Sequence, residues 1–195
     1  MAVFPTVWPA LAQSLEDGLS EAWRSAGKPA DLVMPPPVGV WEVEGSAIQA
    51  RSYEARVPGG EALRLDIRSR TPNPWDAFAA AYTTTDIRAG DLIFVSLWAR
   101  SANPPRGMEA GVLPNVLLQE RGGNYADFGS WTVTLDDEWR SYVFQAVAPR
   151  DFRAGELGVV IHLGRYRQKI DLGPVYALNL GPDTDLDVIP APPAG

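Results

Sequence analysis

One stretch of this chain places aromatic and hydrogen-bonding side chains where a packed β-strand would not need them. From Ile93 to Arg100 every second residue is apolar and can face a core, whereas the opposite face carries Trp98 and Arg100. A strand in a two-layer fold needs only one apolar face, so its other face is available for binding. An indole plane contacts the axial C–H groups of a sugar ring, and a guanidinium bonds its hydroxyls. The pattern therefore predicts that Trp98 and Arg100 contribute to a glycan-binding surface.

Three further side chains are candidates for the same chemistry. Tyr125 ends the sequence Arg-Gly-Gly-Asn-Tyr, a loop in which nothing requires burial, so ligand contact and plain solvent exposure are both open. Gln119 precedes this loop and either forms a bidentate hydrogen bond to a ligand or faces solvent. Trp75 either stacks on a sugar or plugs one end of the fold, the commoner role for a tryptophan after two prolines.

The residue pattern does not support catalysis. His162 is the only histidine and has no partner motif, so a satisfied interior imidazole is a better interpretation than a catalytic base. Cysteine is absent, and no Gly-x-Ser-x-Gly nucleophile motif occurs. No spacing selects the carboxylate pair that glycoside hydrolysis needs from the available Glu109, Glu120, Asp127 and Glu138. We therefore expect a protein that is not an enzyme.

The overall charge and hydropathy exclude several classes of partner. With 24 acidic against 17 basic side chains the net charge is -7, which opposes binding to a nucleic-acid backbone. No apolar run approaches the roughly 20 residues that span a bilayer, so we expect no membrane contact. We expect no cofactor, apart from a possible structural calcium ion held by backbone carbonyls and Asp76 or Asp136. The basic segment Arg165–Lys169 either attracts acidic sugar substituents such as glucuronate or is a solvated hairpin tip.

The elements that must position these side chains are predicted to be short strands. The chain of 195 residues suits one domain, and its 18 glycines and 18 prolines favour frequent turns. Apolar residues recur with period two in five segments, at residues 63–67, 93–100, 131–135, 142–146 and 157–163. Two short segments, Ile87–Leu92 and Phe152–Leu157, are similar, and each places a glycine turn before one of these strands. We predict an all-β fold, a two-sheet antiparallel β-sandwich with a short N-terminal helix.

Proline and acidic runs divide the chain into three parts. Residues 1–34 form an N-terminal arm and helix, in which Met1–Ala12 is either a truncated or misassigned export signal or an ordinary hydrophobic arm. Ser14 is placed to cap the helix. A triple proline then leads into the sandwich, predicted over residues 35–181. Residues 182–195 are predicted to be an acidic, proline-rich linker.

Five motifs in the sandwich segment occur in the order and spacing of a known group of domains. They are Asn73–Asp76, Gly90–Ser101, Glu138–Tyr142, Ile161–Gly164 and Gln168–Gly173. On these motifs, about residues 43–181 resemble carbohydrate-binding modules of the family 4/9/22 jelly-roll group, as found N-terminal to family 10 glycoside hydrolases (endo-xylanases).

This resemblance implies a jelly roll whose concave five-stranded sheet cradles a β-linked plant-type polysaccharide or oligosaccharide, such as xylan or a mixed β-glucan. It implies that the strands carrying Trp98, Arg100 and His162 lie on or near that face. It also puts Gln168 in the motif before the last strand. We expect Trp98, Tyr82 and Tyr125 to be solvent-open on one concave surface. The expected ligand-binding set is Trp75, Tyr82, Trp98, Arg100, Gln119, Tyr125, His162 and Gln168.

Three functions remain open at this point, of which the third, an esterase or glycosidase in its own right, is the one that the residue pattern does not support. The first is a noncatalytic carbohydrate-binding module, secreted or periplasmic, that concentrates a catalytic hydrolase domain of the same polypeptide on its substrate. The second is a structural or interaction domain that stabilises a neighbouring catalytic domain and binds no glycan.

Overall fold

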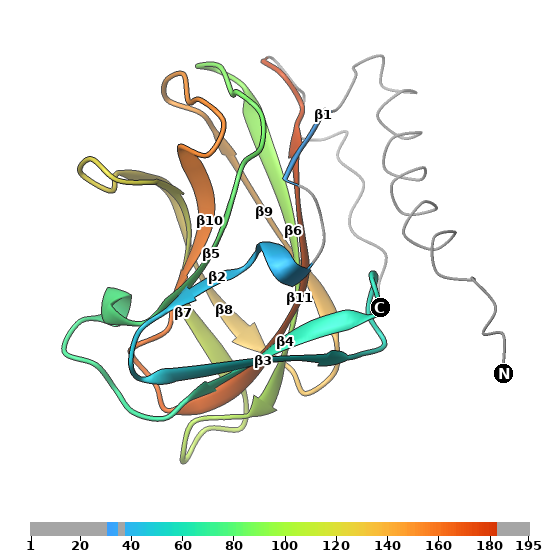
Figure 1. Cartoon of the computed structure of the whole chain (residues 1–195), viewed down its shortest axis with the longest axis vertical. Coiled ribbons are helices and arrows are strands. Elements are labelled where there is room, and N and C mark those ends of the chain that lie inside the picture. The colour runs from blue at the N-terminus through green and yellow to red at the C-terminus, as the bar shows by residue number, and fades with distance from the viewer. Residues whose placement is uncertain (1–30, 35–37, 183–195) are drawn as a thin grey trace, which may run out of the picture.

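The computed structural model of the chain describes residues 31–34 and 38–182 (Figure 1). The predicted N-terminal helix, the apolar stretch Met1–Ala12 and the linker beyond Pro182 lie outside these residues. No helix within the described residues is long and apolar enough to cross a membrane.

Two antiparallel sheets make up nearly all of the described chain. Sheet A is six-stranded, with the order β3-β4-β11-β6-β9 and with β1 also paired to β11; sheet B is five-stranded, with the order β2-β5-β10-β7-β8. The strands of sheet A are β1 (Asp31–Met34), β3 (Ile48–Glu54), β4 (Glu61–Ile67), β6 (Leu92–Asn103), β9 (Arg140–Val147) and β11 (Gln168–Asn179). Those of sheet B are β2 (Glu42–Glu44), β5 (Phe78–Tyr82), β7 (Gly111–Glu120), β8 (Asp127–Leu135) and β10 (Leu157–His162). The 3-10 turns η1 (Val38–Val40) and η2 (Pro74–Asp76) complete the fold.

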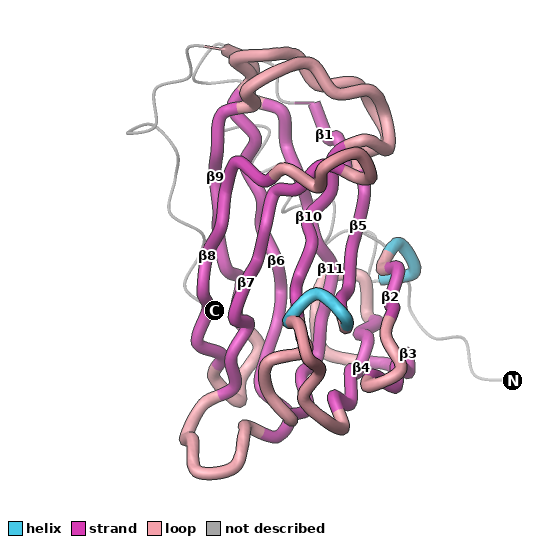
Figure 2. The backbone as a smooth tube through the Cα atoms, turned by 90° about the vertical axis from the view of Figure 1, so that its left-hand side faces the viewer, coloured by secondary structure: helices cyan, strands magenta, loops and turns pink. Residues whose placement is uncertain are grey.

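The sheets pack face to face, with β6 and β11 of sheet A on the right in Figure 1 and sheet B to their left. Figure 2 shows sheet B from its outer side, with β8, β7, β10, β5 and β2 next to one another. This arrangement confirms the prediction of an all-β, two-sheet antiparallel sandwich.

The core lies between the sheets and uses the apolar faces that the period-two pattern identified. Leu65, Ile67 and Leu97 of sheet A and Leu113 and Ile161 of sheet B belong to one cluster and are fully buried. Each of the five segments predicted from the pattern lies largely within a strand. The reason is that one buried face requires an apolar residue at every second position.

The two similar segments, Ile87–Leu92 and Phe152–Leu157, lie side by side. Their first residues form an antiparallel bridge with two backbone hydrogen bonds of 2.8 Å. The preceding aspartates act reciprocally: Asp86 accepts a hydrogen bond from the backbone of the second segment at 2.9 Å, and Asp151 accepts one from the first at 2.8 Å. The sequence similarity therefore corresponds to two matching turns that join the sheets where β6 and β10 begin.

The sandwich begins before the triple proline. Strand β1, which the domain prediction assigned to the N-terminal arm, pairs with β11, where Asp31 lies opposite Asn179 and Leu32 opposite Leu178. Val33 and Met34 are each only 1% exposed, because they are packed in the core. These four residues belong to sheet A, while the division of the whole chain into three parts stays a prediction.

Candidate functional site

The outer face of sheet B is formed by the residues that alternate with its core residues. Near one end of β10, His162 lies opposite Phe78 of β5 and Asn115 of β7. Four residues away, about 13 Å at the usual rise of a strand, Gly158 lies opposite Tyr82 and Gln119. Between these rows lies an apolar floor of Ala80, Leu117 and Val160, against which Phe78 and Tyr82 pack.

Trp75 stands at the His162 end of this face, on η2. The Asp76 carboxylate accepts a hydrogen bond from the Asn73 N–H at 2.9 Å, and the Gly164 N–H donates to the Pro74 carbonyl at 2.9 Å. A glycine at position 164 suits this close approach, because a Cβ there would lie 2.9 Å from the Asn73 carbonyl oxygen, closer than such atoms come. The turn is thus fixed at both ends, and the Trp75 side chain is 57% exposed. The tryptophan does not plug the end of the sandwich and offers an open aromatic surface.

His162 lies beneath this tryptophan and is buried. The two rings are 6.3 Å apart at 63°, an edge-to-face contact. His162 is 9% exposed and so is buried as expected, but its Nδ1 has no hydrogen-bond partner among the described residues, so the expectation that its hydrogen bonds are satisfied is wrong. Burial lowers the pKa of His162 below its ordinary value, against a smaller opposing effect of Asp127. The ring is therefore neutral near pH 7, and its unpartnered Nδ1 is itself buried.

Tyr82 is already stacked at the other end of the face. Its ring packs against Gly158, where a Cβ would lie 2.6 Å from the tyrosine Cδ1. The Arg121 guanidinium lies 4.0 Å from the ring centroid and forms an ion pair of 3.0 Å with Glu42. Burial raises the pKa of Tyr82, so its hydroxyl stays protonated and can donate. A ligand that contacts Tyr82 would therefore also contact the Arg121 guanidinium.

Tyr125 lies beyond Tyr82, in the turn between β7 and β8. Its φ of 53° is in the left-handed region, and its N–H donates to the Gly122 carbonyl at 3.0 Å. The Gln119 Nε2 donates to the Tyr125 carbonyl at 3.0 Å, which makes Gln119 a support for the turn. The Tyr125 side chain is 62% exposed. In Figure 1 this turn and η2 both project to the left of sheet B, from opposite ends of its outer face.

Two of the predicted residues lie on the other sheet. Trp98 and Arg100 belong to β6 in the middle of sheet A, whereas His162 belongs to sheet B. The Arg100 Nε donates to the Asp171 carboxylate at 2.8 Å, and its guanidinium lies 5.1 Å from the centroid of the Trp139 ring. The expectation that Trp98 shares a surface with Tyr82 and Tyr125 is wrong, because the period of a strand does not reveal which sheet it joins.

Gln168 is not available to a ligand in the way predicted. It is 2% exposed, its carbonyl accepts from the Val112 N–H at 3.0 Å, and its Nε2 donates to the Val112 carbonyl at 2.6 Å. These bonds connect β11 of sheet A to β7 of sheet B. Gln168 therefore connects the two sheets.

Some side chains of the outer face were missed by the sequence prediction. Phe78 could have been found, because the segment Phe-Ala-Ala-Ala-Tyr places it on the same face as Tyr82. Asn115 and the pair of Arg121 and Glu42 carry no such signal, since their positions depend on strand pairing and on a contact across 79 residues of sequence.

The predicted calcium ion has no cluster of side-chain ligands in the part of the chain that is described. No three acidic or histidine side chains converge there. Asp76 bonds the backbone of η2, and Asp136 pairs with Arg140. Calcium binding stays a prediction that rests on backbone carbonyls.

Comparison with known proteins identifies the fold. No family profile matches the sequence, and no curated protein matches it. Among solved structures, the chain is similar to the CBM22-1 and GH10 modules of endo-1,4-beta-D-xylanase 10B from Clostridium thermocellum, complexed with xylohexaose, with 13% identity, a TM-score of 0.54 and coverage of 79% of this chain and 28% of that one. It is similar to the CBM22-1-CBM22-2 tandem of Paenibacillus barcinonensis Xyn10C, with 11% identity, a TM-score of 0.52 and coverage of 81% and 48%. The second N-terminal cellulose-binding domain of Cellulomonas fimi beta-1,4-glucanase C gives 19% identity, a TM-score of 0.51 and coverage of 78% and 92%. At these identities the likeness establishes the β-sandwich fold that the chain shares with such modules.

Proposed function

We propose that this protein is a noncatalytic carbohydrate-binding module that holds a β-linked polysaccharide, xylan or a mixed β-glucan, on the outer face of sheet B. The observation that carries the proposal is the exposure of two aromatic rings, Trp75 at 57% and Tyr125 at 62%, at opposite ends of one sheet face. Exposed aromatic rings on rigid turns are the surfaces on which sugar rings stack.

The side chains between the two rings supply hydrogen bonds without any arrangement for bond cleavage. Asn115 offers an amide and Arg121 a guanidinium, whereas the His162 ring is buried beneath Trp75. A polysaccharide lying along β10 would contact the tryptophan first and the tyrosines beyond it. Binding of this kind needs no cofactor and no proton transfer.

The similarity to solved modules supports the same function and suggests its setting. One similar structure contains a module in the same chain as a GH10 domain and is complexed with xylohexaose, and another is a cellulose-binding domain. By analogy, the protein would be secreted or periplasmic and would keep a hydrolase domain of the same polypeptide close to its substrate.

The proposal is tested by affinity electrophoresis through gels that contain xylan or β-glucan, followed by titration calorimetry with xylohexaose. Replacing Trp75 or Tyr125 by alanine should each weaken binding about five-fold, because an aromatic contact contributes about 1 kcal/mol. Trp139→Ala is the matched control, since the Trp139 ring lies 5.1 Å from the Arg100 guanidinium of sheet A and not on the outer face of sheet B.

Two results would overturn the proposal. One is an unretarded wild-type protein at high polymer concentration for every β-linked glycan tested. The other is retarded wild-type protein whose affinity is unchanged by both Trp75→Ala and Tyr125→Ala, which would place the binding surface elsewhere.

A further inference from the structure

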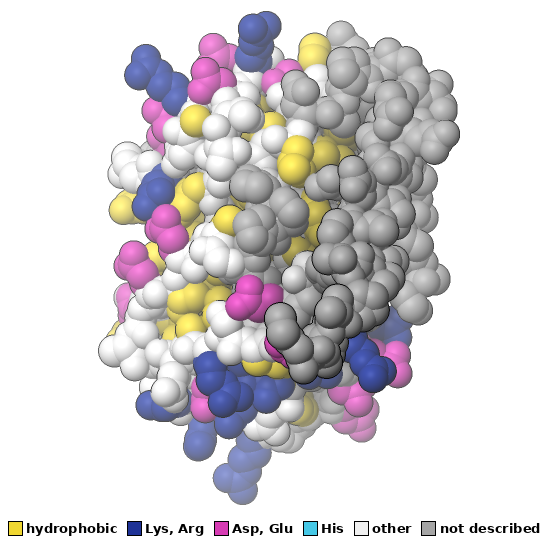
Figure 3. Space-filling model, turned by 45° about the vertical axis from the view of Figure 1, so that its right-hand side comes forward, with side chains coloured by type: hydrophobic (Ala, Val, Ile, Leu, Met, Phe, Trp, Pro, Cys, Tyr) yellow, Lys and Arg dark blue, Asp and Glu magenta, His cyan; other side chains and the backbone are white. Residues whose placement is uncertain are grey.

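Basic side chains are concentrated at the lower end of sheet A, although the protein as a whole has a net charge of -7. Figure 3 shows the dark blue Lys and Arg side chains gathered at this end of the molecule. We use the term basic end for the five side chains that two adjacent segments contribute there: Arg68, Arg70, Arg165, Arg167 and Lys169.

Strand pairing brings these residues together. Strands β4 and β11 pair as far as Ile67 and Gln168. The segments beyond these residues also lie side by side, since the Thr71 N–H donates to the Gly164 carbonyl at 2.9 Å. Arg68 and Arg70 therefore lie beside Arg165–Lys169, and the Arg70 and Arg165 guanidinium groups lie 6.0 and 5.8 Å from the centroid of the Tyr166 ring. The five basic side chains are all exposed.

Little negative charge offsets this group. Lys169 pairs with Asp66 at 3.3 Å, but none of the four arginines of the basic end forms an ion pair with a carboxylate of the described residues. Arg68 donates to the neutral Gln49 side chain. Within the described part of the chain, four guanidinium groups thus keep their charge uncompensated, on a protein whose excess charge has the opposite sign.

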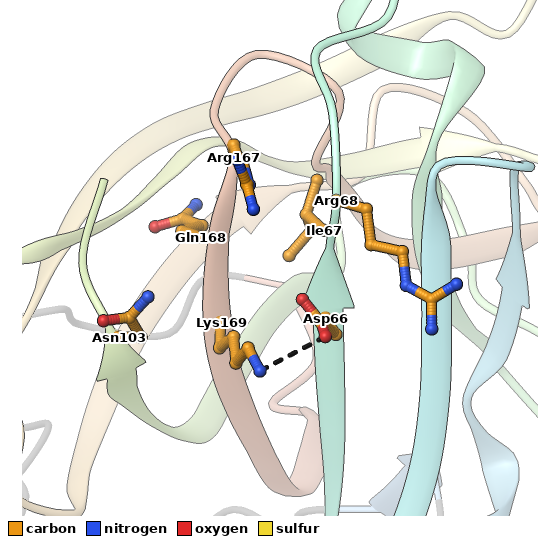
Figure 4. A pocket seen from close by; sticks show the side chains of 7 residues that line it. All are labelled: Asp66, Ile67, Arg68, Asn103, Arg167, Gln168 and Lys169. Atoms are coloured by element: carbon orange, nitrogen blue, oxygen red, sulfur yellow. Dashed lines mark ion pairs between the residues drawn. The ribbon is translucent and has the colours of Figure 1, made fainter. Parts of the chain in front are cut away.

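A cavity of about 320 Å³ opens at the basic end, between β4, β11 and the end of β6 (Figure 4). Arg68, Arg167 and Lys169 line it, with Asp66 and the amide of Asn103. Its volume is at the lower end of the range of about 300 to 1,000 Å³ that small-molecule sites occupy. The lining combines donors for an anion with amide groups for hydroxyls, which is the chemistry of an acidic sugar.

We infer that the basic end binds the carboxylate of a uronic acid residue in an acidic polysaccharide. The planar guanidinium fork matches a carboxylate, and several arginines can engage successive carboxylates of one polymer. Nucleic acid fits less well, because it carries few free hydroxyls for the Asn103 amide that lines the cavity beside these cations. This contact is separate from the outer face of sheet B and would add to the binding of a neutral chain there.

The test compares binding of the full chain to polygalacturonate, to neutral xylan and to a single-stranded oligonucleotide at low ionic strength. The variant Arg165→Gln/Arg167→Gln should bind polygalacturonate about five-fold more weakly and neutral xylan as the wild type does, because exposed charge pairs each contribute weakly. Added salt should weaken binding of polygalacturonate by the wild type.

The matched control is Arg88→Gln/Arg153→Gln. These two exposed arginines lie in the similar turns where β6 and β10 begin, whereas the basic end lies where those strands end. Their replacement changes the net charge by the same amount as Arg165→Gln/Arg167→Gln does. An equal loss of affinity in both double variants, or wild-type binding to the oligonucleotide as tight as to polygalacturonate, would mean a general charge effect and overturn the inference. Absence of wild-type binding to polygalacturonate would also overturn the inference. If the Trp75 and Tyr125 variants bound xylan as the wild type does, only the proposed binding surface on sheet B would be refuted.

Discussion

Replacing Asp171 by asparagine should destabilise the protein by removing the charge at the centre of sheet A. The Asp171 side chain is fully buried on β11 and accepts four hydrogen bonds: two from Arg64 at 2.7 and 2.9 Å, one from the Arg100 Nε at 2.8 Å and one from the Tyr53 hydroxyl at 2.6 Å. An asparagine keeps the size of the side chain but turns one acceptor into a donor that faces other donors. Two guanidinium groups would then lie close together with no counter-charge.

The magnitude follows from the burial of the partners. Breaking a fully buried ion pair costs about 3–5 kcal/mol, but the Arg64 and Arg100 side chains are 33% and 30% exposed and stay partly solvated. We therefore expect a loss of about 2–3 kcal/mol, which for a chain of this length lowers the melting temperature by roughly 5–10 °C. Asp136→Asn is the matched control, because Asp136 and its partner Arg140 are about half exposed and such a pair contributes about 0–1 kcal/mol.

The pH dependence gives the same prediction an independent measurement. Burial alone would raise the pKa of Asp171, but the hydrogen bonds from Arg64, Tyr53 and Arg100 outweigh it and hold the pKa below the ordinary 3.8. The stabilisation is therefore complete above about pH 4 and is lost as the pH falls through the lowered pKa. Urea unfolding at pH 7 and pH 3 should show a gap between wild type and Asp171→Asn that narrows at the lower pH. A variant that melts within 2 °C of the wild type at pH 7 would refute the assigned role of this carboxylate.

One further substitution and one titration test other parts of the structure. Gln168→Leu should destabilise the protein by about 2–4 kcal/mol in urea unfolding, because it leaves the buried N–H and C=O of Val112 unpaired, and xylan binding by the folded variant should be unchanged. A loss of binding without a loss of stability would restore the ligand role first expected of this glutamine. The single histidine makes His162 directly observable by NMR: burial lowers its pKa below 6.5, so the free energy of unfolding should decrease as the pH falls from 6.5 towards that pKa. An imidazole that titrates at or above 6.5 would contradict its buried environment.

Local patterns in the sequence predicted the strands because local geometry determines them. Alternating apolar residues fix which side of a strand is buried, as Leu63, Leu65 and Ile67 do in β4. The similarity of Ile87–Leu92 to Phe152–Leu157 likewise predicted two matching turns, and each turn contains a glycine with positive φ, Gly90 and Gly155. Neither signal depends on knowing which strands are neighbours.

The composition of the binding face could not be predicted in this way, because it depends on contacts between residues far apart in the sequence. Trp98 and His162 each stand on the non-core side of a strand, but β6 joins sheet A and β10 joins sheet B, so the two side chains lie on opposite outer surfaces. The contact partners of these strands are also far away in the sequence. Arg100 donates a hydrogen bond to Asp171, 71 residues further along the chain, and His162 contacts the Trp75 ring of η2.

The two outer surfaces differ in a way that determines which of them can bind a neutral glycan. On sheet A, Arg64, Arg100 and Tyr53 direct their polar groups at Asp171, so a ligand hydroxyl would have to compete with bonds already made to a buried charge. On sheet B, the Trp75 ring is 57% exposed and the Tyr125 ring 62% exposed. A sugar ring can stack on either aromatic plane without breaking an existing hydrogen bond. The same pattern of aromatic and polar residues therefore stabilises the fold on one sheet and leaves binding capacity on the other.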